Sequence, residues 1–93
     1  MPWITKDFTN VPATGQSDVI DVSQMFDKWV ALDNLSAGTV NIQGRLEANG
    51  EWYTLASRVA VGDDIVEVPQ PVISIRLDTN TVTMTRARLR AFQ

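Results

Sequence analysis

The stretch TVNIQGRLE at residues 39–47 alternates apolar and polar side chains along its length. A repeat of two residues is typical of a strand with one face buried and the other in water. The next four residues, ANGE at 48–51, contain an Asn-Gly pair that accepts the positive φ angles of a type I′ turn. Residues 52–56, WYTLA, supply a second strand. The sequence therefore predicts a β-hairpin over residues 39–56.

Further strands are predicted in the C-terminal half of the chain. Residues 65–68, IVEV, follow the turn-forming stretch at 62–64 and end before two prolines, which cannot donate to a central ladder. Residues 72–78 place Ile73, Ile75 and Leu77 on one face and the mostly polar set of Val72, Ser74, Arg76 and Asp78 on the other. We expect each of these two segments to form a strand, with a polar turn at 79–81.

The last segment, residues 82–92, also alternates, but its apolar side chains change face midway. Val82 and Met84 lie in one phase of the alternation, and Ala87, Leu89 and Ala91 lie in the other. One extra residue in a strand exchanges its two faces. The pattern therefore predicts a β-bulge near Thr85 or Arg86.

The N-terminal third has a weaker pattern. Residues 17–22 and 26–32 both fit strands, although a helix beginning at Val22 or Ser23 is an alternative for the second, because Ser23 could cap it. Residues 1–16 contain Pro2, Pro12 and Gly15 and show no sustained alternation. We interpret them as an extended arm that lies across the domain or across a neighbour.

Together these segments predict an all-β fold. A chain of 93 residues leaves room for one compact domain. Seven or eight short strands with half-buried faces need a second layer to cover them. We expect a small antiparallel β-sandwich or jelly-roll-like domain at residues 17–93 with an N-terminal arm at 1–16; a small closed barrel is the alternative.

The composition excludes many kinds of chemistry. The chain has no cysteine and no histidine, so it lacks the residues for disulfides, thiolate metal sites and the commonest general base. Asp63, Asp64 and Glu67 lack the ligand spacing of a calcium loop and are interpreted as solvated turn carboxylates. We expect a protein that is not an enzyme and uses no cofactor or metal. No apolar run approaches the length of a membrane span and no signal-peptide core is present, which favours a soluble, unexported chain.

The aromatic residues are candidate binding residues. Trp3, Trp29, Trp52 and Tyr53 could anchor an interface or form a platform on which a sugar stacks. Trp52 and Tyr53 are neighbours on a predicted strand, so their side chains point to opposite faces. We expect Trp29 and the inward member of this pair to fill the core, and the outward member to meet a partner.

Three of the eight basic residues, Arg86, Arg88 and Arg90, share one face of the last predicted strand. The chain as a whole is acidic, with a net charge of −3, and no aromatic residues interleave with the arginines. These features disfavour nucleic-acid binding. Two interpretations stay open: a solvated, edge-protecting strand with cross-strand ion pairs, or a row that docks onto an acidic surface of another subunit.

Three stretches carry a family resemblance: GTVNIQGR at 38–45, NGEWYTL at 49–55 and VISIRL at 72–77, which a threonine-rich turn follows. Their order resembles that of small β-sandwich structural proteins of tailed bacteriophages, including head decoration or cement proteins. The resemblance implies a noncatalytic protein of the virion, made in the bacterial cytoplasm, that binds the major capsid protein or other virion subunits in many copies. Similar patterns occur in carbohydrate-binding modules and in phage tail or fibre domains, so a carbohydrate-binding or receptor-binding module and a tail or connector component are alternatives.

The expected arm also bears on assembly. Trp3, Ile4 and Phe8 would each forgo roughly 1.5 to 3 kcal/mol of burial if they stayed in water. We expect them to pack on a neighbouring subunit or on the coat, which predicts a homo-oligomer, a dimer or a trimer. The alternative is that the arm folds back on its own sandwich and satisfies the same side chains within one chain.

Overall fold

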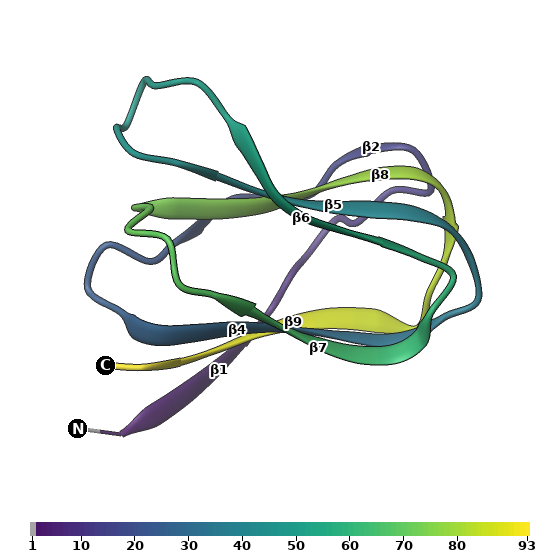
Figure 1. Ribbon diagram of the computed structural model, residues 1–93, viewed down its shortest axis with the longest axis horizontal. Coiled ribbons are helices and arrows are strands. Elements are labelled where there is room, and N and C mark those ends of the chain that lie inside the picture. Colours follow the sequence, from purple (N-terminus) through teal and green to yellow (C-terminus); the bar gives the residue numbers. More distant parts are fainter. Residues whose placement is uncertain (1) are drawn as a thin grey trace.

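The computed structural model describes residues 2–93, which form nine β-strands (Figure 1). No helix occurs within this range. The strands follow one another in chain order with these bounds: β1 (Trp3–Asp7), β2 (Gly15–Gln16), β3 (Ile20–Asp21), β4 (Phe26–Leu35), β5 (Ala37–Arg45), β6 (Tyr53–Val59), β7 (Gly62–Val68), β8 (Ser74–Thr83) and β9 (Arg86–Phe92).

The strands form two antiparallel sheets that pack face to face (Figure 1). Sheet A contains four strands in the order β1-β9-β4-β7. Sheet B contains five, in the order β2-β8-β5-β6 with β3 paired to β8. The predicted all-β sandwich is confirmed. The helix considered from Val22 or Ser23 is wrong, because Phe26–Leu35 is a central strand whose alternate side chains face the core.

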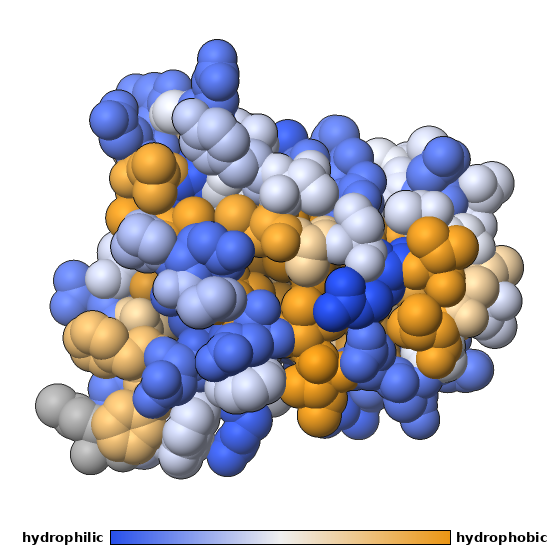
Figure 2. All heavy atoms as spheres, viewed as in Figure 1, coloured by the Kyte–Doolittle hydropathy of each residue, from blue (hydrophilic) through white to orange (hydrophobic). Residues whose placement is uncertain are grey.

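The core lies between the sheets and consists of alternate side chains from the central strands. Val30 and Leu32 of β4 face Val40 and Ile42 of β5, and none of the four is exposed. Burial of such side chains stabilises the fold by roughly 1.5 to 3 kcal/mol each. On the surface, apolar side chains gather at the corner between β6 and β7 (Figure 2). The largest fully buried side chains are Leu32, Leu35, Ile42, Ile75, Leu77, Leu89, Val22, Val30, Val40 and Val68.

The predicted hairpin is present as β5 and β6, but its turn is not the expected tight one. The connection spans residues 46–52, and the Gly50 N–H donates to the Glu47 carbonyl over 3.0 Å. Neither Asn49 nor Gly50 adopts a positive φ angle. A type I′ turn needs positive φ at both central residues, so the longer loop replaces it.

The expected bulge near Thr85 is instead a change of sheet. β8 ends at Thr83 in sheet B, and β9 begins at Arg86 in sheet A. The Thr85 N–H donates to the Asp33 carbonyl over 2.9 Å, and the Ser36 N–H donates to the Thr83 carbonyl over 2.9 Å. The chain also passes from sheet A to sheet B at this place, between β4 and β5. The two hydrogen bonds therefore join one crossing to the other. The core lies between the sheets, so the face of a strand that points to the core differs between sheet B and sheet A. The apolar side chains therefore change phase where the chain passes from one sheet to the other.

Two other segments that were expected to be turns belong to strands. Residues 62–64 begin β7 and residues 79–81 lie within β8. The Asp63 carboxylate accepts a hydrogen bond from the Asn34 N–H over 2.7 Å, where the pairing of β4 with β7 shifts register. The Thr79 hydroxyl donates to the Pro12 carbonyl over 2.8 Å. These polar side chains satisfy backbone groups of neighbouring segments and do not end their strands.

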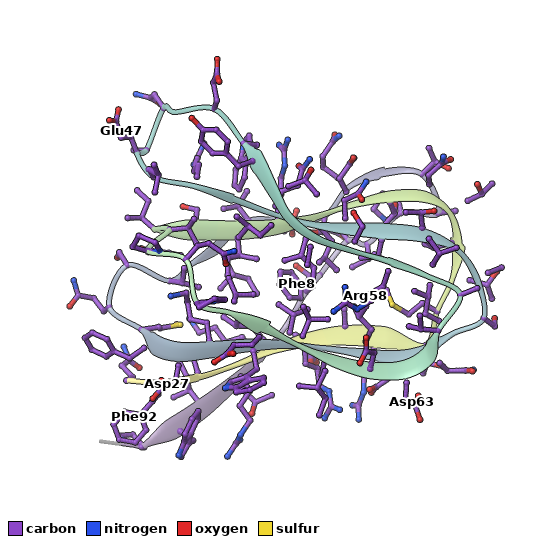
Figure 3. The ribbon with its side chains drawn as sticks, in the orientation of Figure 1. Phe8, Asp27, Glu47, Arg58, Asp63 and Phe92 are labelled. Carbon is purple, nitrogen blue, oxygen red and sulfur yellow. The ribbon has the colours of Figure 1, made fainter. Side chains whose placement is uncertain are left out.

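Residues 2–16, which fall in the expected arm, supply one strand to each sheet. β1 pairs along its whole length with β9, and β2 pairs with β8. Phe8 points into the space between the sheets and is buried (Figure 3). The prolines lie outside the strands, so they remove no ladder donor. The segment therefore folds back on its own sandwich. Between residues 17 and 22, the ladder is limited to Ile20–Asp21.

Candidate functional site

The three arginines of β9 lie on the outer face of sheet A. Their neighbours Ala87, Leu89 and Ala91 are buried in the core, so the alternation of the strand turns the arginines outward. β9 lies between β1 and β4, which makes it an inner strand. The interpretation as an edge-protecting strand is therefore wrong, and the arginines occupy the middle of a sheet face.

Arg86 and Arg88 share the carboxylate of Asp33 on the adjacent strand β4. The Arg86 Nε lies 2.8 Å from Asp33 Oδ2, and an Arg88 amino nitrogen lies 3.1 Å from the same oxygen. The hydrogen bond from Arg86 lowers the pKa of Asp33 below its ordinary value of 3.8; partial burial opposes this shift and the charge of Arg88 adds to it. Cross-strand ion pairing, which the sequence left as one interpretation, accounts for these two arginines.

Arg90 has a different environment. Its guanidinium donates to the Thr5 hydroxyl over 2.9 Å and lies 5.4 Å from the centre of the Trp3 ring. Trp3 in turn meets the edge of Phe92, with ring centres 5.3 Å apart and planes at 75°. No carboxylate of residues 2–93 forms an ion pair with Arg90. The Arg90 guanidinium therefore lies over β1 and is available to bind an anion.

A groove of about 500 Å³ runs across this face between the arginines and the aromatic residues. Ile65 of β7 forms one wall and is 65% exposed, and Trp3 forms the other and is 45% exposed. A neighbouring hollow of about 440 Å³ shares Ala31, Ile65 and Arg88 with it. The outer face of sheet A thus combines apolar, aromatic and cationic groups. The groove is lined by Trp3, Thr5, Trp29, Ala31, Ile65, Arg88 and Arg90.

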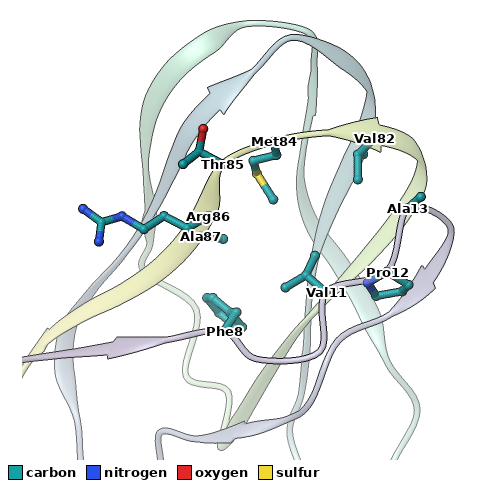
Figure 4. A pocket seen from close by; sticks show the side chains of 9 residues that line it. All are labelled: Phe8, Val11, Pro12, Ala13, Val82, Met84, Thr85, Arg86 and Ala87. Carbon is teal, nitrogen blue, oxygen red and sulfur yellow. The ribbon is translucent and has the colours of Figure 1, made fainter.

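A smaller hollow of about 240 Å³ lies where β8 passes into β9 (Figure 4). Phe8 and Val11 line it from the N-terminal segment, and Met84 lines it from the sheet crossing. Arg86 points away from it in Figure 4, toward Asp33. The hollow lacks paired polar groups that could act on a ligand, and we assign it to the packing of the N-terminal segment.

The predicted binding residues separate into three places. Trp3, Arg88 and Arg90 meet at the groove. Phe8 is 6% exposed and Ile4 packs against the core, so neither offers the surface for a partner that the sequence suggested. Trp52 and Tyr53 lie at the β5–β6 hairpin of sheet B, where the guanidinium groups of Arg45 and Arg76 lie 4.6 and 4.2 Å from the Trp52 ring centre.

Sequence reasoning missed part of the groove. Trp29 was expected to fill the core, but Val30 and Leu32 take the inward positions of β4 and leave Trp29 on the outer face. Ile65 was placed in a strand without a binding role. The signal in the sequence is the alternation of β4. Because Val30 and Leu32 point inward, Trp29, which precedes Val30, points outward.

Comparison with known proteins supports the fold. No protein-family model matches the chain, and no curated protein matches its sequence. Among solved structures, the SPBc2 prophage-derived protein YomS superposes with a TM-score of 0.72, over 97% of this chain and 92% of that chain. The two chains share a fold. Their sequences are 10% identical, so the similarity extends to the two-sheet sandwich and not to particular side chains.

Within residues 2–93, no group of three or more acidic, histidine or cysteine side chains is placed to hold a metal ion. The same residues contain no helix with the length and apolar character needed to cross a bilayer.

Proposed function

We propose that the chain is a noncatalytic structural protein of a bacteriophage particle and that it decorates the assembled head as a cement protein. The observation that carries the proposal is the outer face of sheet A, where Trp3, Trp29 and Ile65 surround two arginines in one groove. Tryptophan and arginine are the residues most enriched at the energetic centres of protein interfaces. The fold similarity to YomS, a protein whose name assigns it to a prophage, supports the choice of a phage particle.

The proposed mechanism is burial of this face against coat subunits. The groove offers large side chains on rigid strands, so little conformational entropy is lost when they become ordered in a complex. A site that spans two coat subunits exists only in the assembled shell. Binding there stabilises the shell by mass action and contributes nothing to free subunits. The partner in this account is the major capsid protein, and the location is the virion.

The absence of catalytic activity is part of the proposal. The sequence has no cysteine or histidine, and Asp33, the acidic residue whose pKa is lowered beside the groove, is held by two arginines. A carboxylate with a lowered pKa is a weaker base than usual and is poorly suited to proton transfer near neutral pH. We assign it a structural role in orienting the arginines.

A second candidate function is sugar binding, which the position of the half-buried Trp29 in the groove favours. Stacking on a sugar needs an open ring face. Trp52 is a poorer platform, because two guanidinium groups already lie against its ring. A glycan array with the parent chain and Trp29→Ala separates this function from head decoration: a saccharide signal that the variant loses would favour sugar binding.

The direct test uses heads of the phage or prophage that encodes the chain. Heads with and without added chain are heated, and the temperature of shell disruption is measured together with co-sedimentation. We expect the chain to sediment with assembled heads, not with free coat subunits, and to raise the disruption temperature. Binding to tails or connectors alone would favour the alternative virion component, and absence of any binding to particles would exclude the proposal.

A further inference from the structure

The edges of the two sheets differ in how their backbone groups are protected. On one side of the sandwich, β6 and β7 are the edge strands of sheets B and A, and Arg58 bonds to Asp64 between them over 2.7 Å. The other Asp64 oxygen accepts the Ile65 N–H over 2.9 Å, and Arg58 donates to the Ser57 carbonyl over 2.8 Å. Figure 3 shows Arg58 in the space between the sheets. One ion pair thus caps a backbone group on each edge.

The two remaining sheet edges differ in the length of their strands. On the other side of sheet B, β2 and β3 have two residues each, too short to template a further strand. β1 has five residues, of which four are exposed, and it pairs only with β9. Within residues 2–93, no side chain is hydrogen-bonded to the backbone of β1. Sheet A therefore ends in an open edge directly beside the groove.

Arg90 gives this edge a chemical preference. Thr5 lies opposite Arg90 in the register of β1 and β9, and its short side chain lets the guanidinium reach over β1. On an added strand, the side chain opposite Thr5 would lie about 5 Å away between Cβ atoms. A carboxylate at that position could accept a charge-assisted hydrogen bond from Arg90.

We propose that the edge of β1 accepts an extended segment of a partner protein, with an aspartate or glutamate opposite Thr5 that binds Arg90. The added strand extends sheet A by backbone hydrogen bonds, and its alternate side chains continue the groove past Trp3. This inference rests on the proposed function, because it names the chemistry of the partner segment that docks on the same face.

A second copy of the chain fits this edge less well. In an antiparallel two-fold pairing, Asp7 of the second copy lies opposite Thr5 only when the two copies of Lys6 face each other. Directly opposed like charges destabilise a strand pair. The pairing centred on Thr5 avoids that clash but leaves Arg90 without a carboxylate. The register therefore favours a different, acidic chain over self-association at β1.

The test is a titration of the isotope-labelled full chain with short strand-forming peptides that differ only in a central Glu, Gln or Lys. We expect the Glu peptide to bind about tenfold more tightly than the Gln peptide, which is the effect of one charge-assisted hydrogen bond. Arg90→Gln should remove that preference. Arg76→Gln, which deletes the same charge from the outer face of sheet B, should keep it. Amide exchange of β1 should slow in the complex, while β6 and β7 stay unchanged.

Equal affinity for the Glu and Gln peptides, no binding of any of them at millimolar concentration, or protection at β6 or β7 would overturn the proposal. A dimer of the free chain whose interface is β1 would overturn it as well, because a second copy would then occupy the edge. The titration needs no phage heads. If the peptides fail to bind while the chain still binds heads, the edge site is excluded and the docking function stands. If the peptides bind while the chain does not bind heads, the proposed function is excluded.

Discussion

The fold leaves no room for a side chain at Gly38. This glycine adopts a φ of +81°, and a Cβ at this position would overlap the backbone carbonyl of Thr81 on the paired strand β8. The pairing of β5 with β8 shifts register at this point, so the close approach of the two backbones needs a residue without a side chain.

Gly38→Ala should therefore destabilise the chain by roughly 3 kcal/mol or more, through strain and displacement of Thr81. Gly62→Ala is the matched control: Gly62 has a φ of +76° but no atom within 4 Å of the added methyl, so only the backbone strain of about 1 kcal/mol is expected. Urea unfolding of both variants measures the difference. Equal losses would show that Thr81 can move without cost.

Asp33 makes stability depend on pH. The bond from Arg86 lowers the pKa of Asp33 in the folded chain below the ordinary 3.8, so folding favours the ionised carboxylate. A lowered pKa contributes stability that is present above the unfolded value and is lost as pH falls through the folded value. Asp33→Asn should be less stable than the parent at neutral pH, and the gap should close well below pH 3.8.

Unfolding free energies of the parent and Asp33→Asn across this range measure the effect. Arg86→Gln should shrink the gap, because Arg86 is the main cause of the shift. A gap that stays constant down to strongly acidic pH would contradict this role for the ion pairs.

At the scale of the elements, Arg58 and Asp64 protect two strand edges that would otherwise present unpaired backbone groups. Each side chain is about a third exposed, at 35% and 34%, so we expect little loss of stability when the pair is broken. The larger effect should be on association, because uncapped edges are templates for pairing with another chain.

Asp64→Ala should raise the average mass in solution relative to the parent, as measured by light scattering across concentration. Glu67→Ala is the control, since it removes an equal charge from the exposed face of the same strand β7. If the two variants associate to the same extent, net charge explains the change and capping does not.

The elements also show how far the sequence determines the fold. The strand pattern of residues 39–47 and of 82–92 was readable because half-buried strands alternate with a period of two. The change of sheet at Thr85 was not readable, because a bulge and a crossing shift the phase in the same way. β1 was missed because Trp3, Thr5 and Asp7 all face outward and only Ile4 and Phe8 mark the inner side.

The candidate site was predictable only in part for a related reason. The spacing of Arg88 and Arg90 placed them on one face, but their neighbours Trp29 and Ile65 come from strands far away in the sequence. Whether a tryptophan fills the core or lines a groove depends on the phase of its strand relative to a second sheet. That relation is set by the tertiary pairing of β4 with β7 and β9, which local pattern does not contain.

At the scale of the whole molecule, the sequence also predicts a dimer or trimer, and this remains a prediction. Its original reason is weakened, because Ile4 and Phe8 are covered within the same chain. Light scattering of the parent chain measures the oligomeric state directly. An oligomer would have to use side chains other than Ile4 and Phe8.

The outer face of sheet A is the proposed particle-binding surface, and a pair of substitutions separates it from the rest of the molecule. Ile65 in the groove and Val59 at the β6–β7 corner are similarly exposed, at 65% and 63%, so Ile65→Glu and Val59→Glu add the same charge with little effect on folding. Co-sedimentation with heads should fall at least about tenfold for Ile65→Glu, because the added carboxylate loses its water at the interface and a neighbouring arginine offsets only part of that cost. It should stay unchanged for Val59→Glu. Retained binding of Ile65→Glu, or a loss confined to Val59→Glu, would contradict this assignment.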